Sequence, residues 1–310
     1  MDSSNNHLKV GLALSGSGNR SAFYIGFLEY LSEQNIKVDY ITACSGGSLV
    51  AAAYACGTLP EFKKLIFSLT PESLKNYMKR TNGGGFYSID LLEEAIRTYT
   101  KGLNFEEVRP LMGFVAVDIQ NGEKVLLCMG DIARAARISC TLPGIFEPVQ
   151  WGGKTLIDGG LLTMVPGDFL KQAGMDVTIG VNMRGTKHIF TENQISAKKF
   201  FNLLKKIFLI DNLENILNNI FTNGSEGLKK PRMFEVIGKS LDLAIEANKK
   251  NSNTEEDCDL MIYPEIPKFK KNEFSPETNL YFYQRGREVA TENMNKIKKL
   301  INQKNNELRF

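Results

Sequence analysis

The segment 43–47 contains residue types that could form a nucleophile. It reads A-C-S-G-G, follows a short apolar run and precedes the small residues of 48–56. A serine hydroxyl becomes reactive when a sharp strand-to-helix turn exposes it beside a base and N–H donors. The segment therefore predicts Ser45 as a nucleophile. From this motif alone, Ser45 as a simple N-cap of the following helix is an equally good interpretation.

A loop with two glycines at 15–21 could bind an anion. It reads S-G-S-G-N-R-S and lies between an expected strand and an expected helix, where backbone N–H groups converge. The anion could be a cofactor phosphate or the oxyanion of an acyl-transfer intermediate. The loop has no P-loop lysine, and Ser21 replaces the third glycine of a dinucleotide fingerprint. Nucleotide binding is therefore the weaker alternative, beside an ordinary tight turn with Arg20 at the surface.

A candidate base is Asp158, which precedes Gly159 and Gly160 at the end of an expected strand. An ionised carboxylate within hydrogen-bonding distance of Ser45 could take its proton directly. In isolation, Asp-Gly-Gly is more typical of a turn in which the aspartate bonds to its own backbone. The catalytic interpretation therefore depends on the other two motifs.

Strand-loop-helix units are needed to position these motifs. Apolar residues predict a buried strand at 9–14 with a helix over 22–31, and a second strand at 40–43 with a helix over 48–56. Asn121-Gly122 predicts a two-residue turn in a hairpin of strands 111–118 and 123–129. Other helices are expected over 60–69, 71–79, 89–99, 132–139 and 280–300. Other strands are expected over 151–157, interrupted by Gly152-Gly153, and over 177–182 and 260–263. This alternation predicts an α/β fold, with helices flanking a mostly parallel central sheet.

The composition argues against several functions. A net charge of +3 on 310 residues is too small to indicate nucleic-acid binding. The five cysteines form no CxxC pair, which fits a reducing compartment, and two histidines cannot build a Cys/His zinc cluster. Of these histidines, His188 lies in a polar loop and His7 in the polar N-terminal stretch. Cys44 is expected to be a small buried packing residue.

Two sequence features indicate whether the chain spans or contacts a membrane. The first residues lack the apolar core of a signal peptide, and no uncharged apolar run reaches the roughly 18–20 residues of a transmembrane helix. A cytoplasmic protein is therefore expected. Residues 200–221 carry an apolar stripe at helical spacing, with lysines clustered near its start, which predicts an amphipathic helix in a helical insertion over 186–256. We expect 198–221 to make peripheral membrane contact, although a helix that covers the sheet is the commoner role of such a stripe.

In this order, the three sites resemble those of the patatin-like phospholipase family, whose members combine a glycine-rich oxyanion loop, a serine elbow and an Asp-Gly base. The resemblance implies a single domain over 1–310 with a three-layer α/β/α patatin-like fold. It also implies Ser45 as nucleophile, Asp158 as base, and no metal or organic cofactor. The segments that carry it are 12–21 (LALSGSGNRS), 44–47 (CSGG), 139–148 (SCTLPGIFEP) and 157–161 (IDGGL), with Val165-Pro166 beyond them. The residues assigned by resemblance to oxyanion and substrate binding are Gly16, Ser17, Gly18, Arg20 and Gly46.

The function implied by this resemblance is hydrolysis of fatty-acyl esters in phospholipids, lysophospholipids or acylglycerols. The chain departs from the family pattern at Ser17 and Ser21, where glycine is usual, and at Ala43, where the elbow pattern has its first glycine. Of these departures, Ser17 and Ala43 support an alternative, a catalytically silent lipid-binding protein of the same fold. A nucleotide-binding α/β protein is the remaining alternative.

Overall fold

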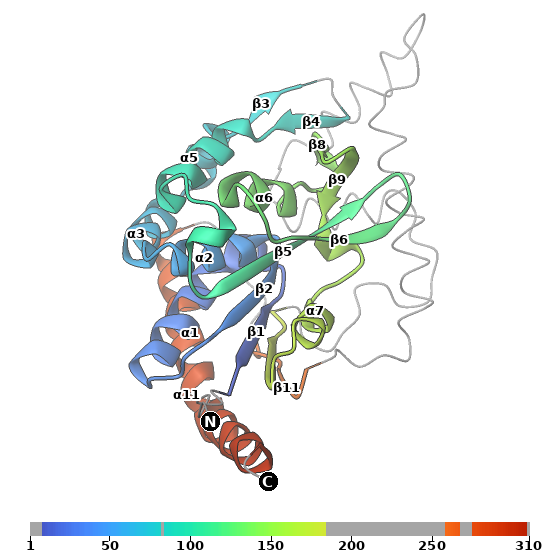
Figure 1. Ribbon diagram of the computed structural model, residues 1–310. Coiled ribbons are helices and arrows are strands. Elements are labelled where there is room, and N and C mark those ends of the chain that lie inside the picture. The colour runs from blue at the N-terminus through green and yellow to red at the C-terminus, as the bar shows by residue number, and fades with distance from the viewer. Residues whose placement is uncertain (1–7, 82–83, 184–257, 267–274, 309–310) are drawn as a thin grey trace, which may run out of the picture.

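A mostly parallel sheet forms the centre of the computed structural model, which describes residues 8–81, 84–183, 258–266 and 275–308 (Figure 1). The sheet has eight strands in the order β11-β10-β1-β2-β5-β9-β8, and β6 also pairs with β5. The strands from β11 to β5 in this order pair in parallel, whereas β9, β8 and β6 pair antiparallel. Their bounds are β1 Val10–Leu14, β2 Tyr40–Cys44, β5 Leu111–Asp118, β6 Glu123–Leu127, β8 Val149–Trp151, β9 Lys154–Asp158, β10 Val177–Val181 and β11 Leu260–Ile262.

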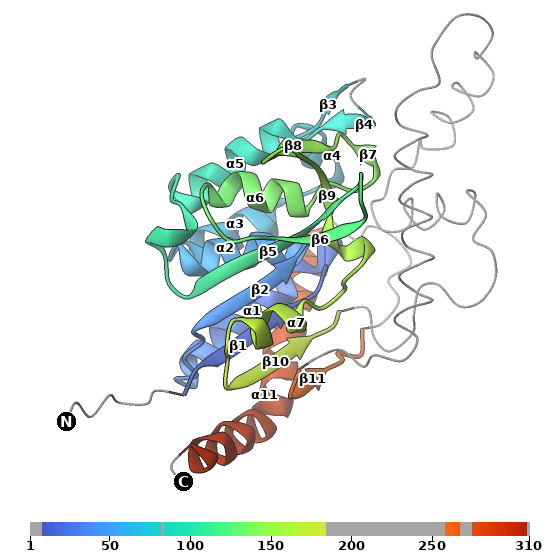
Figure 2. The ribbon, with the colours of Figure 1, turned by 45° about the vertical axis from the view of Figure 1, so that its right-hand side comes forward.

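Helices cover both faces of this sheet (Figures 1 and 2). Side chains of β1 alternate between the faces, so that Leu12 and Leu14 enter the large core while Ala13 packs in a smaller core with Leu170 of α7. The large core lies under α1 Ser21–Glu33, α2 Gly46–Ala55, α3 Leu59–Ser68, α5 Asp90–Thr100, α6 Ile132–Ser139 and α11 Pro276–Glu307, and the smaller one under α7 Gly167–Gln172. The predicted three-layer α/β/α fold is therefore confirmed.

Two glycines allow α1 and α11 to cross at close range. A Cβ on Gly26 would lie 2.1 Å from the carbonyl oxygen of Tyr283, and one on Gly286 would lie 2.0 Å from that of Phe23. Both contacts are with backbone atoms, so a side chain at either position would force the helices apart. The close approach buries Phe282 of α11 against the large core.

A second, smaller sheet was not predicted from the sequence. Its order is β3-β4-β7, with β3 Lys79–Arg80, β4 Gly85–Ser88 and β7 Gly144–Phe146. The helix expected over 71–79 is accordingly only α4 Pro71–Lys75. The interruption expected at Gly152-Gly153 within 151–157 is confirmed, because both glycines have positive φ and turn the chain between β8 and β9, which pair antiparallel.

The hairpin at Asn121-Gly122 exists, but its loop is longer than predicted. Asp118 pairs with Glu123, which leaves four residues, 119–122, in the loop rather than two. The Gly122 N–H donates to the Asp118 carbonyl at 2.8 Å and closes the loop.

Some expectations lie outside the described residues: the 186–256 insertion, the 198–221 amphipathic helix, His7 and His188. Within the described ranges, every helix is too short or too polar to cross a lipid bilayer.

Candidate active site

Ser45 lies in a strained turn between β2 and α2. Its φ of 50° and ψ of −128° are rare for a residue with a side chain and cost about 1–3 kcal/mol. Two glycines permit the turn, because a Cβ on Gly46 would lie 2.6 Å from Ser17 Oγ, and one on Gly47 would lie 2.7 Å from the Ser15 carbonyl oxygen. Ser45 occupies the N-cap position of α2, yet its hydroxyl makes no capping hydrogen bond. The strained turn therefore presents the hydroxyl of a half-buried serine that does not cap the start of α2.

Strand β5 brings the Ser45 turn and Asp158 together. Since β6 occupies one edge of β5 along 114–118, β2 and β9 must share the other edge, β2 along 111–115 and β9 along 116–118. Strand β2 runs parallel to β5 and ends at Cys44 opposite Val115. Strand β9 runs antiparallel and ends at Asp158 opposite Ala116. The carboxyl ends of two strands separated by more than a hundred residues therefore meet at consecutive positions of β5.

The Asp158 carboxylate is buried, with 3% of the residue exposed. Its Oδ1 accepts a hydrogen bond from the Gly160 N–H at 2.8 Å and lies 3.5 Å from Cys44 Sγ, which donates to it. The Gly160 bond is the Asx-type turn that the sequence offered as the alternative role of Asp158. This turn is compatible with a role for Asp158 as a base, because the hydrogen bond engages Oδ1 and orients the carboxylate.

The loop after β1 lies directly against Ser45. A Cβ on Gly16 would be 3.3 Å from Ser45 Cβ and 4.0 Å from its Oγ. Gly18–Arg20 forms a short 3-10 helix, η1, and Arg20 Nη1 donates to the Met183 carbonyl oxygen at 3.3 Å. This bond ties the loop to the segment that follows β10. Gly46 and Gly47 are the first two residues of α2, where backbone N–H groups have no carbonyl partner one turn earlier in the helix. Both lie beside the same loop, since a Cβ on Gly46 would be 2.9 Å from the Gly18 carbonyl oxygen and one on Gly47 would be 2.7 Å from that of Ser15.

The C-terminal end of α6 and the residues just beyond it connect the Ser45 turn to the Asp158 turn, a role that the sequence did not reveal. Ser139 Oγ accepts from the Ser45 N–H at 2.9 Å and donates to the Val115 carbonyl at 2.8 Å. Two residues later, the Thr141 carbonyl accepts from the Asp158 N–H at 2.8 Å. These residues belong to the 139–148 segment of the family resemblance, so a signal was present, but nothing in a sequence says that a buried serine bonds to a distant backbone.

Comparison with known proteins supports the resemblance. The family model described as "Patatin-like phospholipase" matches residues 12–171, which include the end of β1, the Ser45 turn and Asp158. The chain belongs to the patatin-like phospholipase family. An uncharacterized NTE family protein of Mycobacterium tuberculosis (strain ATCC 25618 / H37Rv) is 28% identical over 180 residues, which cover 58% of this chain and 50% of that protein.

Two more similarities extend the comparison. The lysophospholipase NTE1 of Scheffersomyces stipitis is 27% identical over 195 residues, 56% of this chain and 12% of the yeast protein. Among solved structures, VipD from Legionella pneumophila aligns with a TM-score of 0.48 and 14% identity over 96% of this chain and 67% of VipD. This patatin-like chain therefore matches half or less of the length of these curated relatives.

The two serines that replace glycine in the family loop, Ser17 and Ser21, adopt unstrained backbone conformations in this patatin-like chain. Ser17 has a φ of −118°, a conformation open to any residue, so glycine is not required there. Ser21 Oγ lies 3.0 Å from the Gly18 carbonyl oxygen and 3.3 Å from that of Gly46. Ser17 Oγ lies 3.2 Å from Ser21 Oγ. The serines thus connect the loop to the start of α2. Ala43 is fully buried in β2, where its methyl group fits the large core.

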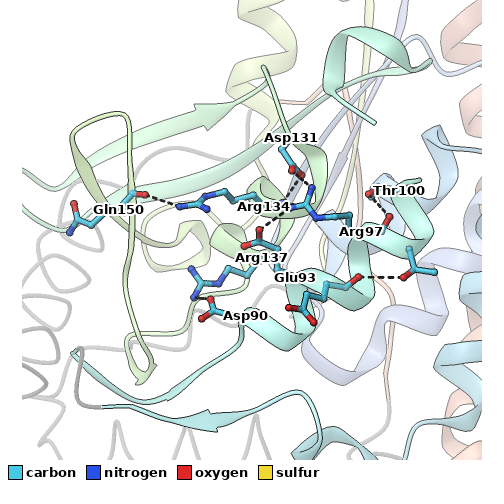
Figure 3. Close-up of polar contacts among 10 residues, drawn as sticks. Asp90, Glu93, Arg97, Thr100, Asp131, Arg134, Arg137 and Gln150 are labelled. Carbon is cyan, nitrogen blue, oxygen red and sulfur yellow. Dashed lines mark hydrogen bonds and ion pairs between the residues drawn. The ribbon is translucent and has the colours of Figure 1, made fainter. Parts of the chain in front are cut away.

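Charged side chains fix α6, the helix that delivers Ser139 (Figure 3). Arg137, with 6% of its side chain exposed, places Nη2 2.7 Å from Asp90 Oδ1. Asp131 caps α6 by accepting from the Arg134 N–H at 3.1 Å, and it pairs with Arg97 of α5. Burial is the main reason that the pKa of Arg137 lies below its ordinary value, although Asp90 opposes the shift. These contacts hold α5 and α6 together on the side of the fold that supports Ser139.

Every site residue named from the sequence that the structure describes is placed in this region: Gly16, Ser17, Gly18, Arg20, Ser45, Gly46 and Asp158. Cys44 is fully buried, in agreement with its predicted packing role, but its thiol also contacts Asp158. Within the described ranges, no three His, Cys, Asp or Glu side chains are grouped to hold a metal ion. The region brings together a serine hydroxyl, a buried carboxylate and backbone N–H groups, which are the kinds of group that acyl transfer needs.

Proposed function

We propose that this protein hydrolyses fatty-acyl esters of lipids, with Ser45 as nucleophile and Asp158 as base. The observation that carries the proposal is the end-to-end meeting of β2 and β9 along β5, which sets the strained Ser45 turn beside a buried carboxylate. Membership of the patatin-like phospholipase family supports the same chemistry and points to lipids as the substrate class.

In the acylation step, Ser45 Oγ attacks the ester carbonyl carbon while Asp158 accepts the hydroxyl proton. The negative oxygen of the tetrahedral intermediate is stabilised by N–H groups of 16–18 and of Gly46. Such donors are worth about 10²–10³ in rate each when they are correctly placed. When the intermediate collapses, the ester C–O bond breaks, and Asp158 returns its proton to the departing alcohol.

Deacylation repeats the same steps with water. Asp158 takes a proton from a water molecule while the water oxygen attacks the acyl carbon of the Ser45 ester. The second intermediate collapses with cleavage of the bond to Ser45 Oγ, which recovers its proton from Asp158, and the fatty acid is released. The family resemblance implies a Ser-Asp pair that acts without a histidine, and the Gly160 N–H orients the Asp158 carboxylate for this role.

Which lipid is the natural substrate is a separate question from the catalytic mechanism. The yeast relative is named a lysophospholipase, so lysophospholipids are the first natural substrates to compare with intact phospholipids and acylglycerols. Measured release of free fatty acid from each lipid would rank them by kcat/KM.

The proposal is tested by the release of p-nitrophenol from a medium-chain p-nitrophenyl ester. We expect activity in the wild type and its loss in both Ser45→Ala and Asp158→Asn, with the matched control Ser32→Ala unchanged, because Ser32 is exposed on α1. A fluorophosphonate probe should label the wild type at Ser45, and should not label Ser45→Ala. Activity that survives in Ser45→Ala refutes the proposed nucleophile. A folded wild type with neither turnover nor labelling, but with lipid binding, would instead identify a catalytically silent lipid-binding protein.

A further inference from the structure

We propose that the Cys44 thiol is a positioning residue for Asp158, holding the carboxylate in its ionised form toward Ser45 by donating an S–H···O hydrogen bond. This inference rests on the proposed function of Asp158 as base. The thiol is fully buried, and Sγ lies 3.5 Å from Asp158 Oδ1, which it reaches across the junction between β2 and β9.

The junction between β2 and β9 leaves room for the contact between Cys44 and Asp158. Cys44 is opposite Val115 and Asp158 is opposite Ala116, so the two residues are neighbours along one edge of β5. A Cβ on Gly160 would lie 3.1 Å from Asp158 Oδ1 and 3.3 Å from Cys44 Sγ. A residue larger than glycine at position 160 would therefore crowd both the sulfur and the oxygen.

A buried carboxylate needs donors to remain ionised, because burial without hydrogen bonds favours its neutral form. Oδ1 receives the Gly160 N–H and the Cys44 S–H. A thiol is a weak donor to a neutral acceptor, but a bond to an ionised acceptor is stronger. Removing the S–H therefore raises the pKa of Asp158, so that the base becomes protonated, and inactive, at a higher pH than in the wild type.

Titratable groups near Asp158 among the described residues come from α6 and β5. Cys140, which follows α6, has its pKa raised by burial and by the charge of Asp158, so it stays a neutral thiol over the working range. The carboxylate of β5 is Asp118, which is itself bonded by the N–H groups of Gln120 and Thr155 and faces Lys154 at 3.7 Å.

Two further elements complete this environment. The η3 turn, Gly159–Leu161, carries no titratable side chain. In the loop after β1, the titratable group is Arg20, whose Nη1 bonds to Met183 O. The Cys44 thiol donates to Asp158 Oδ1, and this donor hydrogen can be removed without changing a charge.

Infrared spectroscopy tests the contact without requiring turnover, because the S–H stretching band lies in a window free of other protein absorption. The Cys44 band is assigned from the difference between wild type and Cys44→Ser. We expect it at the lower frequency of a hydrogen-bonded thiol, and expect it to move higher in Asp158→Asn and when the pH is lowered through the pKa of Asp158. A band at the frequency of a non-bonded thiol that responds to neither change overturns the proposal.

The pH dependence of ester hydrolysis tests the consequence. In Cys44→Ala, the acid limb of kcat should move up by about half to one pH unit, with KM unchanged, since one unit of pKa is a tenfold change in the protonation equilibrium. Cys44→Ser keeps a donor and should restore the wild-type limb. The matched control is Cys56→Ala, a buried cysteine beyond the C-terminus of α2, and its limb should not move.

The two tests separate the two hypotheses. An acid limb in Cys44→Ala that coincides with that of a folded, active wild type overturns the positioning role, whatever the infrared result. If the wild type has no esterase activity, the proposed function fails, while the infrared titration still decides whether the thiol donates to the carboxylate.

Discussion

Replacing Ser139 by alanine removes the side chain that connects the Ser45 turn to the central sheet. In the native structure, Ser139 Oγ accepts from the Ser45 N–H at 2.9 Å and donates to the Val115 carbonyl at 2.8 Å. Ser139 is fully buried, so no solvent replaces the hydroxyl directly. The substitution leaves one donor and one acceptor without their partner.

The magnitude follows from these two bonds. Each contributes about 0.5–1.5 kcal/mol net, and a buried polar group left without a partner costs about 1–3 kcal/mol. We therefore expect Ser139→Ala to lower the free energy of unfolding by roughly 2–4 kcal/mol. The Ser45 turn, already strained at φ 50°, loses one of its constraints. Since a displacement of about 1 Å in a reacting group can cost 10²-fold in rate, kcat should fall by roughly 10–100-fold.

The assay pairs urea denaturation with ester hydrolysis at a temperature where both proteins are fully folded. The control is Ser32→Ala, which removes the hydroxyl of an exposed residue; this hydroxyl bonds to the Leu28 carbonyl within α1 and lies 3.1 Å from the Tyr54 hydroxyl at an exposed position. That control should change the free energy of unfolding by less than about 0.5 kcal/mol and should leave kcat unaltered. A Ser139→Ala protein with wild-type kcat would refute the reasoning that Ser139 holds the nucleophile turn.

Three other predictions address packing, thiol reactivity and the turn. Gly286→Ala should destabilise the protein by about 1–3 kcal/mol or more in thermal unfolding, because its Cβ would lie 2.0 Å from the Phe23 carbonyl oxygen. A limiting alkylating reagent at neutral pH should modify Cys128 well before Cys140, because Cys128 is exposed. Burial raises the pKa of both thiols, and Asp158 raises that of Cys140 further; peptide mass spectrometry of the labelled native protein measures the order. Gly46→Ala should abolish ester hydrolysis while circular dichroism remains native, since the added methyl group would meet the loop after β1.

The sequence predicted the elements around the site well because their signals are local. Buried apolar runs identify β1 and β2, and small residues after Ser45 identify α2. The same local reasoning failed for β3 and β4. Those short strands have no hydrophobic alternation of their own, and β4 is stabilised by pairing with β7, some sixty residues away in the chain.

For a similar reason, the connection between the Ser45 turn and the Asp158 turn could not be predicted from the sequence. Ser139 and Thr141 act through backbone atoms of residues distant in sequence, and a sequence shows only side-chain types. Cys44 was expected to pack because a buried cysteine usually does. Its contact with Asp158 depends on which two strands share an edge of β5, and that is a property of the assembled sheet.

Strand register also determines where the proposed base points. In β9, Leu156 enters the large core and Ile157 packs in a separate core on the opposite face, and both are fully buried. A slip of one residue would exchange these faces and turn Asp158 away from Cys44 and Ser45. Burial of each apolar side chain stabilises the correct register by about 1.5–3 kcal/mol. The packing of two residues that take no part in the chemistry is therefore what selects the orientation of the carboxylate.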